Sequence, residues 1–295
     1  MRAVLITLVT AIVVTPLSGQ TDSGIDSPSG TGRRITRAQC AAHLEAMQSR
    51  IPTGFDTVLE PPFVVLGDGG RDAVARSAER TVRWAVELLR RDFFRDDPRE
   101  VLEVWLFDGK TSYQKHCREL FGEPPTTPFG FYSPRHGALI MNIATGGGTL
   151  VHEIVHPFVA ANVEDCPAWL NEGLGSLFEQ CRERDGRITG LLNWRLDGLQ
   201  QAIRAERTVP LGKLLATSSA EFYGERSGLH YAEARYLLYW LQENGKLQAF
   251  WRDWLATRER DPTAAAAMRR ALAIDGDGLA AFQREWEGWL LRQQR

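Results

Sequence analysis

The pattern of apolar and polar positions divides the chain into a mixed first half and a helical second half. In the first half, apolar runs at 62–68 and 100–108 predict strands. Amphipathic spacing predicts helices at 37–48, 71–94 and 110–122, the last of them closed by a glycine. The first half is therefore expected to be a small sheet with helices.

A hairpin is predicted just before the second half begins. Residues 129–132 and 138–143 are largely apolar and are separated by a turn at 133–137. From Thr149 onward the apolar spacing is helical almost throughout. The tail carries tryptophans at helical spacings that are expected to pack in the core: Trp251, Trp254, Trp286 and Trp289. The expected fold class is α+β, a small mixed sheet with an edge hairpin followed by a mostly helical C-terminal half.

The first 20 residues have the pattern of a secretory signal peptide. Arg2 precedes an apolar run from Ala3 to Val14, and small residues follow near Ser18 and Gly19. We therefore interpret 1–20 as a signal peptide and expect a secreted or periplasmic protein. The alternative is an uncleaved N-terminal segment that anchors the chain to a membrane. No later stretch is apolar enough to span a bilayer.

The rest of the chain divides by composition. Residues 21–37 are polar and rich in glycine and serine, which predicts a flexible linker. An α/β part is expected over 38–145 and a helical part over 146–295. The chain of 295 residues is 24% charged and 43% hydrophobic with a formal net charge of −2, as is ordinary for a soluble globular protein. Nothing in that charge indicates a nucleic-acid partner.

Export would make disulfides chemically feasible. The four cysteines are Cys40, Cys117, Cys166 and Cys181. Four cysteines can pair in three ways, and the sequence does not choose among them. None lies in a CxxC pair, so zinc held by cysteines is not expected.

The segment that carries chemistry is GGGTLVHEIVHPFVAAN, residues 146–162. On a helix, His152 and His156 lie about 40° apart on one face, one turn from each other. Two imidazoles so placed can share one metal ion, and Glu153 can reach a water beside that ion without binding the ion itself. The HExxH pattern thus predicts two Zn²⁺ ligands and a general base. The alternative is an ordinary helix whose histidines face solvent or satisfied core partners.

A catalytic zinc needs a third protein ligand. A third histidine at position 162 with glycine at 159 is excluded, because Asn162 and Val159 stand there. A second predicted helix, within CPAWLNEGLGSLFEQC (166–181), supplies Glu172. Gly173 and Gly175 flank it and would let this helix approach the histidine helix closely. The alternative is that Glu172 lies on a solvated helix face, and the weaker candidate ligands are Glu179, Glu164 and Asp165.

HEIVH followed by WLNEGLGSLFE resembles the gluzincin clan of zinc peptidases, which includes the thermolysin and aminopeptidase N families. The mixed sheet and helices, the hairpin and the helical HYAEARYLLYWLQENG look most like the bacterial peptidase MA-like proteins. The resemblance covers roughly 60–290 and implies one zincin-like catalytic domain over about 57–295. It implies that His152, His156 and Glu172 bind Zn²⁺ and that Glu153 is the general base.

The resemblance also implies a donor for the oxyanion that forms during hydrolysis. In the aminopeptidase relatives this is a tyrosine in a segment similar to YAEARYLLYWL, which places it at Tyr231. His230 is the alternative, since thermolysin-type sites use histidine, and Tyr223 and Tyr236 are weaker candidates. A further alternative is that Tyr231 only packs on the core at the start of a helix.

Three features depart from the family pattern. Pro157 follows His156 and removes an N–H that would bond to the Glu153 carbonyl, which tends to kink the helix. Ser176 occupies the position where thermolysin-type enzymes have an aspartate that orients a histidine, so that support is expected from elsewhere, such as Glu179. The amine-anchoring segment of aminopeptidases is absent, which argues against trimming from the N-terminus.

The function expected from the sequence is that of an exported zinc-dependent metallopeptidase acting on a peptide or protein substrate. An extended peptide could add to the segment GALIMNIA (137–144) if that segment is an exposed edge strand; the alternative is a fully paired strand. Two other functions remain open: a catalytically inactive zincin-fold binding or scaffold protein, and a zinc amidase or esterase acting on a non-peptide substrate.

Overall fold

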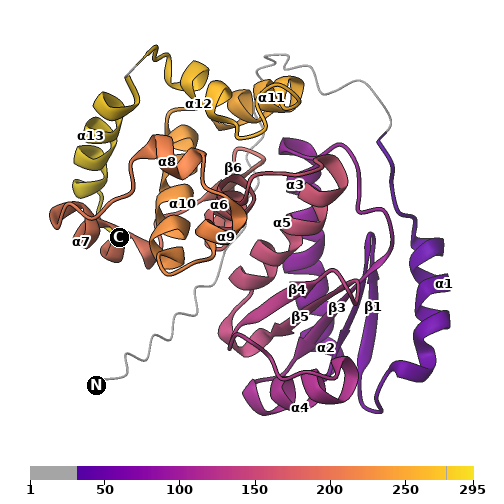
Figure 1. The fold of residues 1–295 in the computed structure, drawn as a ribbon. Helices are drawn as coiled ribbons and strands as arrows, with labels where there is room; N and C mark the ends of the chain where they lie inside the picture. The colour runs from indigo at the N-terminus through magenta and orange to yellow at the C-terminus, as the bar shows by residue number, and fades with distance from the viewer. Residues whose placement is uncertain (1–31, 277) are drawn as a thin grey trace. The chain divides into compact units, whose positions relative to one another are not determined.

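The structure, a computed structural model, describes residues 32–276 and 278–295. These residues belong to one compact unit. The expected signal peptide at 1–20 and the expected linker as far as residue 31 lie outside the described residues. The fold class is α+β, as predicted: a five-stranded mixed sheet is followed by a mostly helical C-terminal half (Figure 1). Among the described residues, no helix combines the length and the apolar character needed to cross a membrane.

The five strands form a sheet in the order β1-β2-β3-β5-β4. Parallel pairing joins β2 to β3 and β3 to β5, whereas β1 and β4 pair antiparallel at the two edges. The strands are β1 Asp56–Glu60, β2 Phe63–Gly67, β3 Leu102–Phe107, β4 Gly130–Ser133 and β5 Ala138–Asn142. The predicted strands at 62–68 and 100–108 are confirmed as β2 and β3, while β1 was not predicted.

Helices cover both faces of the sheet. Alternate residues of a strand point to opposite faces, so Leu66 packs in one apolar cluster and Val65 in the other. The first cluster is completed by α1 (Arg37–Met47) and α4 (Lys110–Phe121). On the other face lie α2 (Arg71–Ser77), the π-helical stretch η2 (Ala78–Arg83), α3 (Trp84–Asp92) and the later helix α5 (Gly148–Asn162).

These helices confirm the three helical predictions of the first half. Within the predicted range 71–94, α2, η2 and α3 form one helical run from Arg71 to Asp92, with a π-helical stretch in the middle rather than a break. Gly122 closes α4 in the left-handed conformation with φ 79°, which a residue without a Cβ adopts readily.

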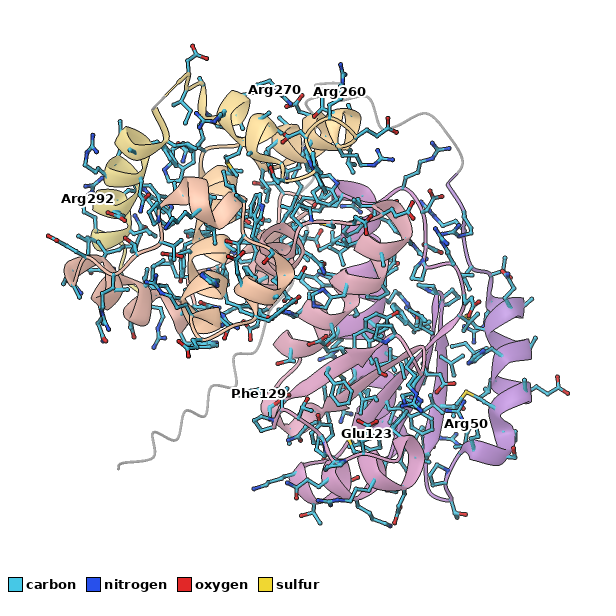
Figure 2. All side chains as sticks on the ribbon, viewed as in Figure 1. Arg50, Glu123, Phe129, Arg260, Arg270 and Arg292 are labelled. Carbon is cyan, nitrogen blue, oxygen red and sulfur yellow. The ribbon has the colours of Figure 1, made fainter. Side chains whose placement is uncertain are left out.

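The predicted hairpin is confirmed, and its strand at the edge of the sheet is β4 rather than β5. Tyr132 of β4 pairs with Leu139 of β5, and β5 also pairs along its far side with β3. Residues 138–142 are therefore paired on both sides, so of the two alternatives for this segment the paired strand is the one observed. The edge of the sheet next to α5 is β4, and Phe129, which precedes it, is 52% exposed (Figure 2).

The second half is helical apart from one small hairpin. Its helices are α5, α6 Ala168–Phe178, α7 Arg195–Arg204, α8 Leu211–Leu215, α9 Ser219–Phe222, α10 Ser227–Glu243, α11 Leu247–Thr257, α12 Ala265–Leu272 and α13 Gly278–Leu291. Two short 3-10 turns, η1 Gln48–Arg50 and η3 Ile143–Thr145, belong to the first half. The hairpin, β6 Cys181–Arg184 with β7 Arg187–Gly190, was not predicted. It turns at Asp185 and Gly186, which both have positive φ, as favoured two-residue hairpin turns require.

The tail packs as predicted. Trp251, Trp254 and Trp286 are each 1% exposed and Trp289 is half-buried against the same cluster. The four cysteines carry free thiols; Cys40 and Cys117 are buried, and Cys166 and Cys181 are half-buried.

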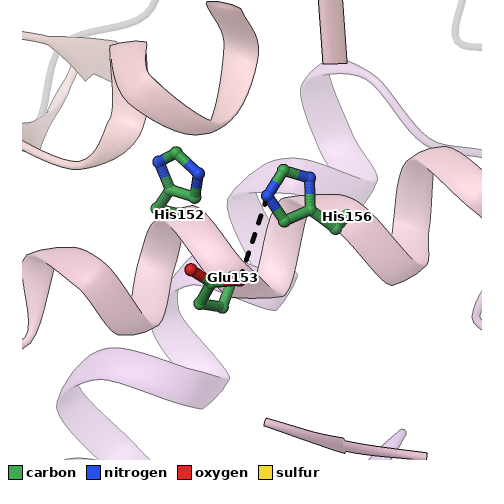
Figure 3. A group of neighbouring side chains, drawn as sticks. All are labelled: His152, Glu153 and His156. Atoms are coloured by element: carbon green, nitrogen blue, oxygen red, sulfur yellow. Dashed lines mark ion pairs between the residues drawn. The ribbon is translucent and has the colours of Figure 1, made fainter. Parts of the chain in front are cut away.

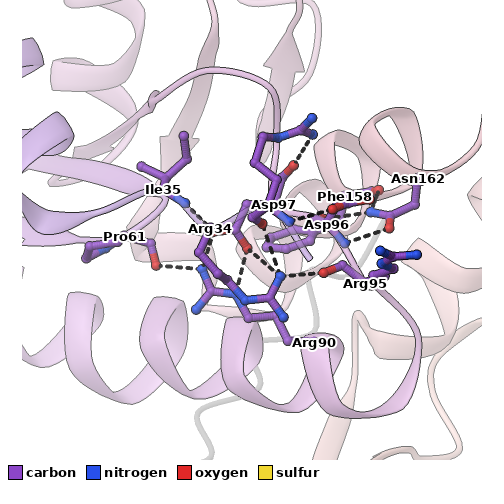
Figure 4. A network of polar contacts seen from close by, with 10 residues as sticks. Arg34, Ile35, Pro61, Arg90, Arg95, Asp96, Asp97, Phe158 and Asn162 are labelled. Carbon is purple, nitrogen blue, oxygen red and sulfur yellow. Dashed lines mark hydrogen bonds and ion pairs between the residues drawn. The ribbon is translucent and has the colours of Figure 1, made fainter. Parts of the chain in front are cut away.

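Hydrogen bonds hold the chain just before α1 in place. The backbone N–H of Ile35 donates to the carboxylate of Asp97 over 2.8 Å, and Arg90 pairs with the same carboxylate over 2.7 Å (Figure 4). Asp97 is fully buried, and a buried carboxylate needs such partners. Residues 33–36, the end of the expected linker, are therefore held against the loop that follows α3.

Candidate metal centre

The centre lies where α5 packs against α6. The predicted histidine helix is α5, and it continues through Pro157 to Asn162. Asn162 occupies the position where a third histidine ligand would have been needed. Its side chain connects the end of α5 to the loop after α3. Its side-chain amide donates to the Asp96 carbonyl over 2.7 Å and its oxygen accepts the Asp96 N–H over 2.8 Å (Figure 4).

Three donor atoms from the two helices converge. The Nε2 atom of His152 lies 3.2 Å from Oε2 of Glu172, and Nε2 of His156 lies 3.7 Å from the same oxygen. Two ligands about 2.1 Å from a tetrahedral zinc lie about 3.4 Å apart. The observed spacings fall on either side of that value, and two imidazole nitrogens with one carboxylate oxygen are a donor set that zinc favours.

Glu153 belongs to the same cluster but in a different position. Ligand atoms of His152, Glu153 and His156 all lie within 4.8 Å of one another, and Oε2 of Glu153 is 3.9 Å from Nε2 of His156 (Figure 3). Glu172 lies closer than this to both imidazoles. Oε2 of Glu172 therefore faces both imidazoles, and Oε2 of Glu153 lies beside His156.

Glu172, Glu153 and His156 each have a further polar partner. Asn171 Oδ1 lies 3.0 Å from Nδ1 of His156, which fixes the ring and leaves Nε2 to face the cluster. The hydroxyl of Tyr223 donates to Oε1 of Glu172 over 2.7 Å, so the free oxygen Oε2 faces the histidines. Sequence reasoning missed Asn171, although it directly precedes Glu172 in the N-E-G segment, and it did not predict the contact of Tyr223 with Glu172.

The general-base candidate is held by the edge strand. The backbone N–H of Tyr132 in β4 donates to Oε2 of Glu153 over 2.9 Å. Hydrogen bonds between β4 and β5 use the N–H groups that point the other way, so this N–H faces away from the sheet. The hairpin thus places the carboxylate of Glu153, a role that the sequence did not indicate.

A glycine makes the approach of the two helices feasible. A Cβ built at Gly175 would lie 3.0 Å from Nε2 of His152, which is closer than ordinary van der Waals contact. Gly175 therefore acts as predicted. Gly173 does not face the histidine helix, because its Cβ would instead meet Leu238 at 3.0 Å and the Ala234 carbonyl at 3.3 Å on α10.

The charges of the cluster stabilise one another. Burial works to lower the pKa of His152, but the hydrogen bond to Glu172 and the charges of Glu153 and Glu172 outweigh it and raise that pKa. Burial works to raise the pKa of Glu172, and the two histidines with the Tyr223 hydroxyl more than reverse the effect. Both shifts favour a charged His152–Glu172 pair.

The two oxyanion candidates end up in different places. Tyr231 is half-buried with its ring centre 6.4 Å from that of Tyr223. Burial, and then the charge of Glu172, raise the pKa of Tyr231. His230 is buried, stacks on the Phe222 ring, and places Nδ1 3.0 Å from the Phe222 carbonyl. Within the described residues, His230 forms no ion pair or hydrogen bond with the donor atoms of the cluster.

The weaker candidate ligands do not join the cluster. Glu164 and Asp165 are exposed in the loop after α5. Glu179 pairs with Arg195 over 3.2 Å, so the support for a histidine that we expected from Glu179 comes instead from Asn171. The Ser176 hydroxyl is buried and has no hydrogen-bond partner in the part of the chain that the structure describes.

The chain matches no protein-family model and no curated protein. The likeness to gluzincin peptidases therefore depends on the residues of the two motifs and on the geometry described above.

Proposed function

We propose that this protein is an exported zinc-dependent metallopeptidase of gluzincin type. The observation that carries the proposal is the convergence of His152, His156 and Glu172 on a common point, with Glu153 beside it. Two separate motifs supply these groups, and the fold brings them together at spacings that suit a single ion. The export part of the proposal depends on the signal-like pattern of residues 1–20.

His152, His156 and Glu172 would hold the ion. Bound zinc would polarise a substrate carbonyl and make water more acidic. Glu153 takes a proton from the attacking water and passes it to the leaving amine. Before a substrate is bound, the Tyr132 N–H holds the Glu153 carboxylate in place.

The developing negative charge on the carbonyl oxygen needs a second donor. We assign that role to Tyr231. Its raised pKa keeps its hydroxyl protonated, and the neighbouring Tyr223 hydroxyl is already used by Glu172. His230 is the less suitable of the two, because Nδ1 of its ring is directed at the Phe222 carbonyl.

The decisive test separates metal binding from turnover. Glu153→Gln keeps an oxygen that can accept the Tyr132 N–H but cannot take a proton. We expect the variant to retain one zinc per chain by elemental analysis and to lose about 10²- to 10⁴-fold in the cleavage of a quenched peptide library. Full activity in this variant would refute the general-base assignment. Zinc bound to the wild-type chain without any cleavage would favour the scaffold alternative, and activity on amides or esters alone would favour a non-peptide substrate.

A matched pair of glutamates on or near α6 tests the ligand assignment. Glu172→Ala removes the oxygen that both histidines face, so we expect zinc affinity to fall by at least about 100-fold. Glu179→Ala removes a half-buried carboxylate seven residues later that pairs with Arg195, and zinc affinity should stay within about twofold of wild type. Equal losses in a competitive chelator titration would contradict the assignment of Glu172.

A further inference from the structure

A cavity of about 480 Å³ opens between α7 and α10. Its wall on the α7 side includes Trp194 and Arg195, and Arg207 follows that helix. Glu225 and Arg226 come from the segment that leads into α10. None of these five residues was predicted as part of a site.

The charge of this cavity is unbalanced. Three arginines line it against a single acidic residue, Glu225. Arg195 is paired with Glu179 over 3.2 Å. Across residues 32–276 and 278–295, neither Arg207 nor Arg226 forms an ion pair. Arg226 donates to the Arg207 carbonyl, which holds the two arginines close together and leaves their positive charge uncompensated.

The nearest buried carboxyl does not supply the missing charge. Glu233 lies one residue beyond the cavity-lining Ala232 and is fully buried. Burial raises the pKa of Glu233 to about 8, so it is largely protonated at neutral pH. The cavity is therefore positively charged when empty.

The cavity is connected to the metal centre through stacked side chains. The guanidinium of Arg195 lies 4.2 Å from the ring centre of Trp194 and 5.3 Å from that of Tyr231. The Tyr231 ring in turn lies 6.4 Å from that of Tyr223, whose hydroxyl donates to Glu172 over 2.7 Å. Trp194 is 58% exposed, so it offers an open apolar wall beside the charged groups.

We propose that this cavity is a substrate subsite that binds a carboxylate group of the peptide, held by Arg207 and Arg226 and flanked by Trp194. The proposal rests on the peptidase function proposed above. Arginine forks bind carboxylates through paired charge-assisted hydrogen bonds, and a peptide offers a carboxylate from an acidic side chain or from its C-terminus. The substrate class is thus peptides with a carboxylate a few residues from the cleaved bond.

Binding without turnover tests this inference. The Glu153→Gln chain is titrated into rhodamine-labelled Ala-Leu-Glu-Leu-Ala amide, into its glutamine counterpart, and into Ala-Leu-Ala-Leu-Ala as the free acid and as the amide. Fluorescence anisotropy reports the Kd. We expect one or both carboxylate peptides to bind about five- to tenfold more tightly than their neutral partners, the size expected of partly exposed charge pairs. The comparison between the two pairs shows whether the side chain or the C-terminus is bound.

The same titrations are repeated with Arg207→Gln/Arg226→Gln and with Arg204→Gln. Arg204 is an exposed residue in the last turn of α7 that does not line the cavity. The double variant should lose the preference, and the Arg204 control should keep it; thermal unfolding checks that all chains fold alike. Equal binding of charged and neutral peptides, or a preference that survives the double substitution, overturns the proposal. Because anisotropy needs no hydrolysis, a carboxylate preference in these titrations combined with a wild-type chain that never cleaves a peptide contradicts the peptidase function alone.

Discussion

At the scale of single residues, three of the four polar groups of the candidate centre are fixed by a further contact. His156 is oriented by Asn171, Glu172 by Tyr223, and Glu153 by the backbone of Tyr132. Partners of this kind keep ligand atoms in place and typically change metal affinity by about 10- to 100-fold when removed. The spacing within HEIVH was enough to predict that His152 and His156 lie beside each other on one helix. Tyr223 could not be predicted with them, because it lies 51 residues after Glu172 and reaches it only through the fold.

Substitution of Tyr223 should impair zinc binding, whereas substitution of Tyr231 should impair turnover. Tyr223→Phe removes the hydrogen bond to Oε1 of Glu172, so we expect about a 10-fold loss of zinc affinity. Tyr231→Phe removes the proposed oxyanion donor, so zinc affinity should be unchanged while kcat falls by about 10²-fold or more. Chelator competition and steady-state kinetics on both variants check this, and a loss of kcat without loss of zinc in Tyr223→Phe would reverse the two roles.

At the scale of elements, the centre depends on how closely α6 approaches its two neighbours. Gly175 faces His152 on α5, and Gly173 faces α10. Helix α6 therefore packs tightly against α5 on one side and α10 on the other, with one glycine at each contact. The sequence predicted two helices in close approach, but it could not predict which glycine serves which neighbour, because that depends on the rotation of α6 about its axis.

Alanine at these two positions should therefore give different defects. In Gly175→Ala the new methyl group displaces the His152 ring by a few tenths of an ångström, so zinc affinity should fall by about 10-fold or more with little loss of stability. In Gly173→Ala the methyl group meets Leu238, so the chain should lose about 1–3 kcal/mol of unfolding free energy and keep its zinc affinity. Urea unfolding and chelator competition measure the two quantities. The same pattern in both variants would contradict the orientation of α6.

The strands that sequence analysis missed share a physical cause. β1 is a half-buried edge strand without a clean alternation of apolar and polar residues, and β6 is almost wholly exposed. Neither presents the apolar face that makes a strand visible in a sequence. The Asp185–Gly186 pair was a usable signal for the β6–β7 turn, but the strands beside it, CRER and RITG, are too short and polar to support it.

At the scale of the whole molecule, the stability of the second half depends on a buried helix that carries two ionisable side chains. Glu233 and Arg235 of α10 are both fully buried. They are not paired with each other: Glu233 accepts the Val209 N–H, and Arg235 donates to the Ser176 and Leu191 carbonyls. Burial lowers the pKa of Arg235 to about 10 and raises that of Glu233 to about 8. Apolar periodicity predicted the helix, but not that it would be buried all round.

The buried carboxyl should give the protein a recognisable pH dependence. The pKa of Glu233 is raised from 4.5 to about 8 on folding, so between these values the folded chain binds a proton that the unfolded chain has lost. The free energy of unfolding should therefore fall as pH rises through this window, by up to about 1.4 kcal/mol per pH unit. Glu233→Gln should remove this contribution and stabilise the protein above pH 8, whereas the exposed control Glu285→Gln should not. Urea unfolding at pH 5, 6.5 and 8 measures the slopes; parallel curves for wild type and Glu233→Gln would refute the assignment.

The N–H of Tyr132 that holds Glu153 also has a consequence for catalysis. It lies on the open side of β4, where an incoming extended chain would form its first backbone hydrogen bond. A ligand that pairs there must compete with Glu153 for a single proton, and in doing so it sets the carboxylate free. Docking and the release of the base would then be one event, and an empty site would keep its base restrained.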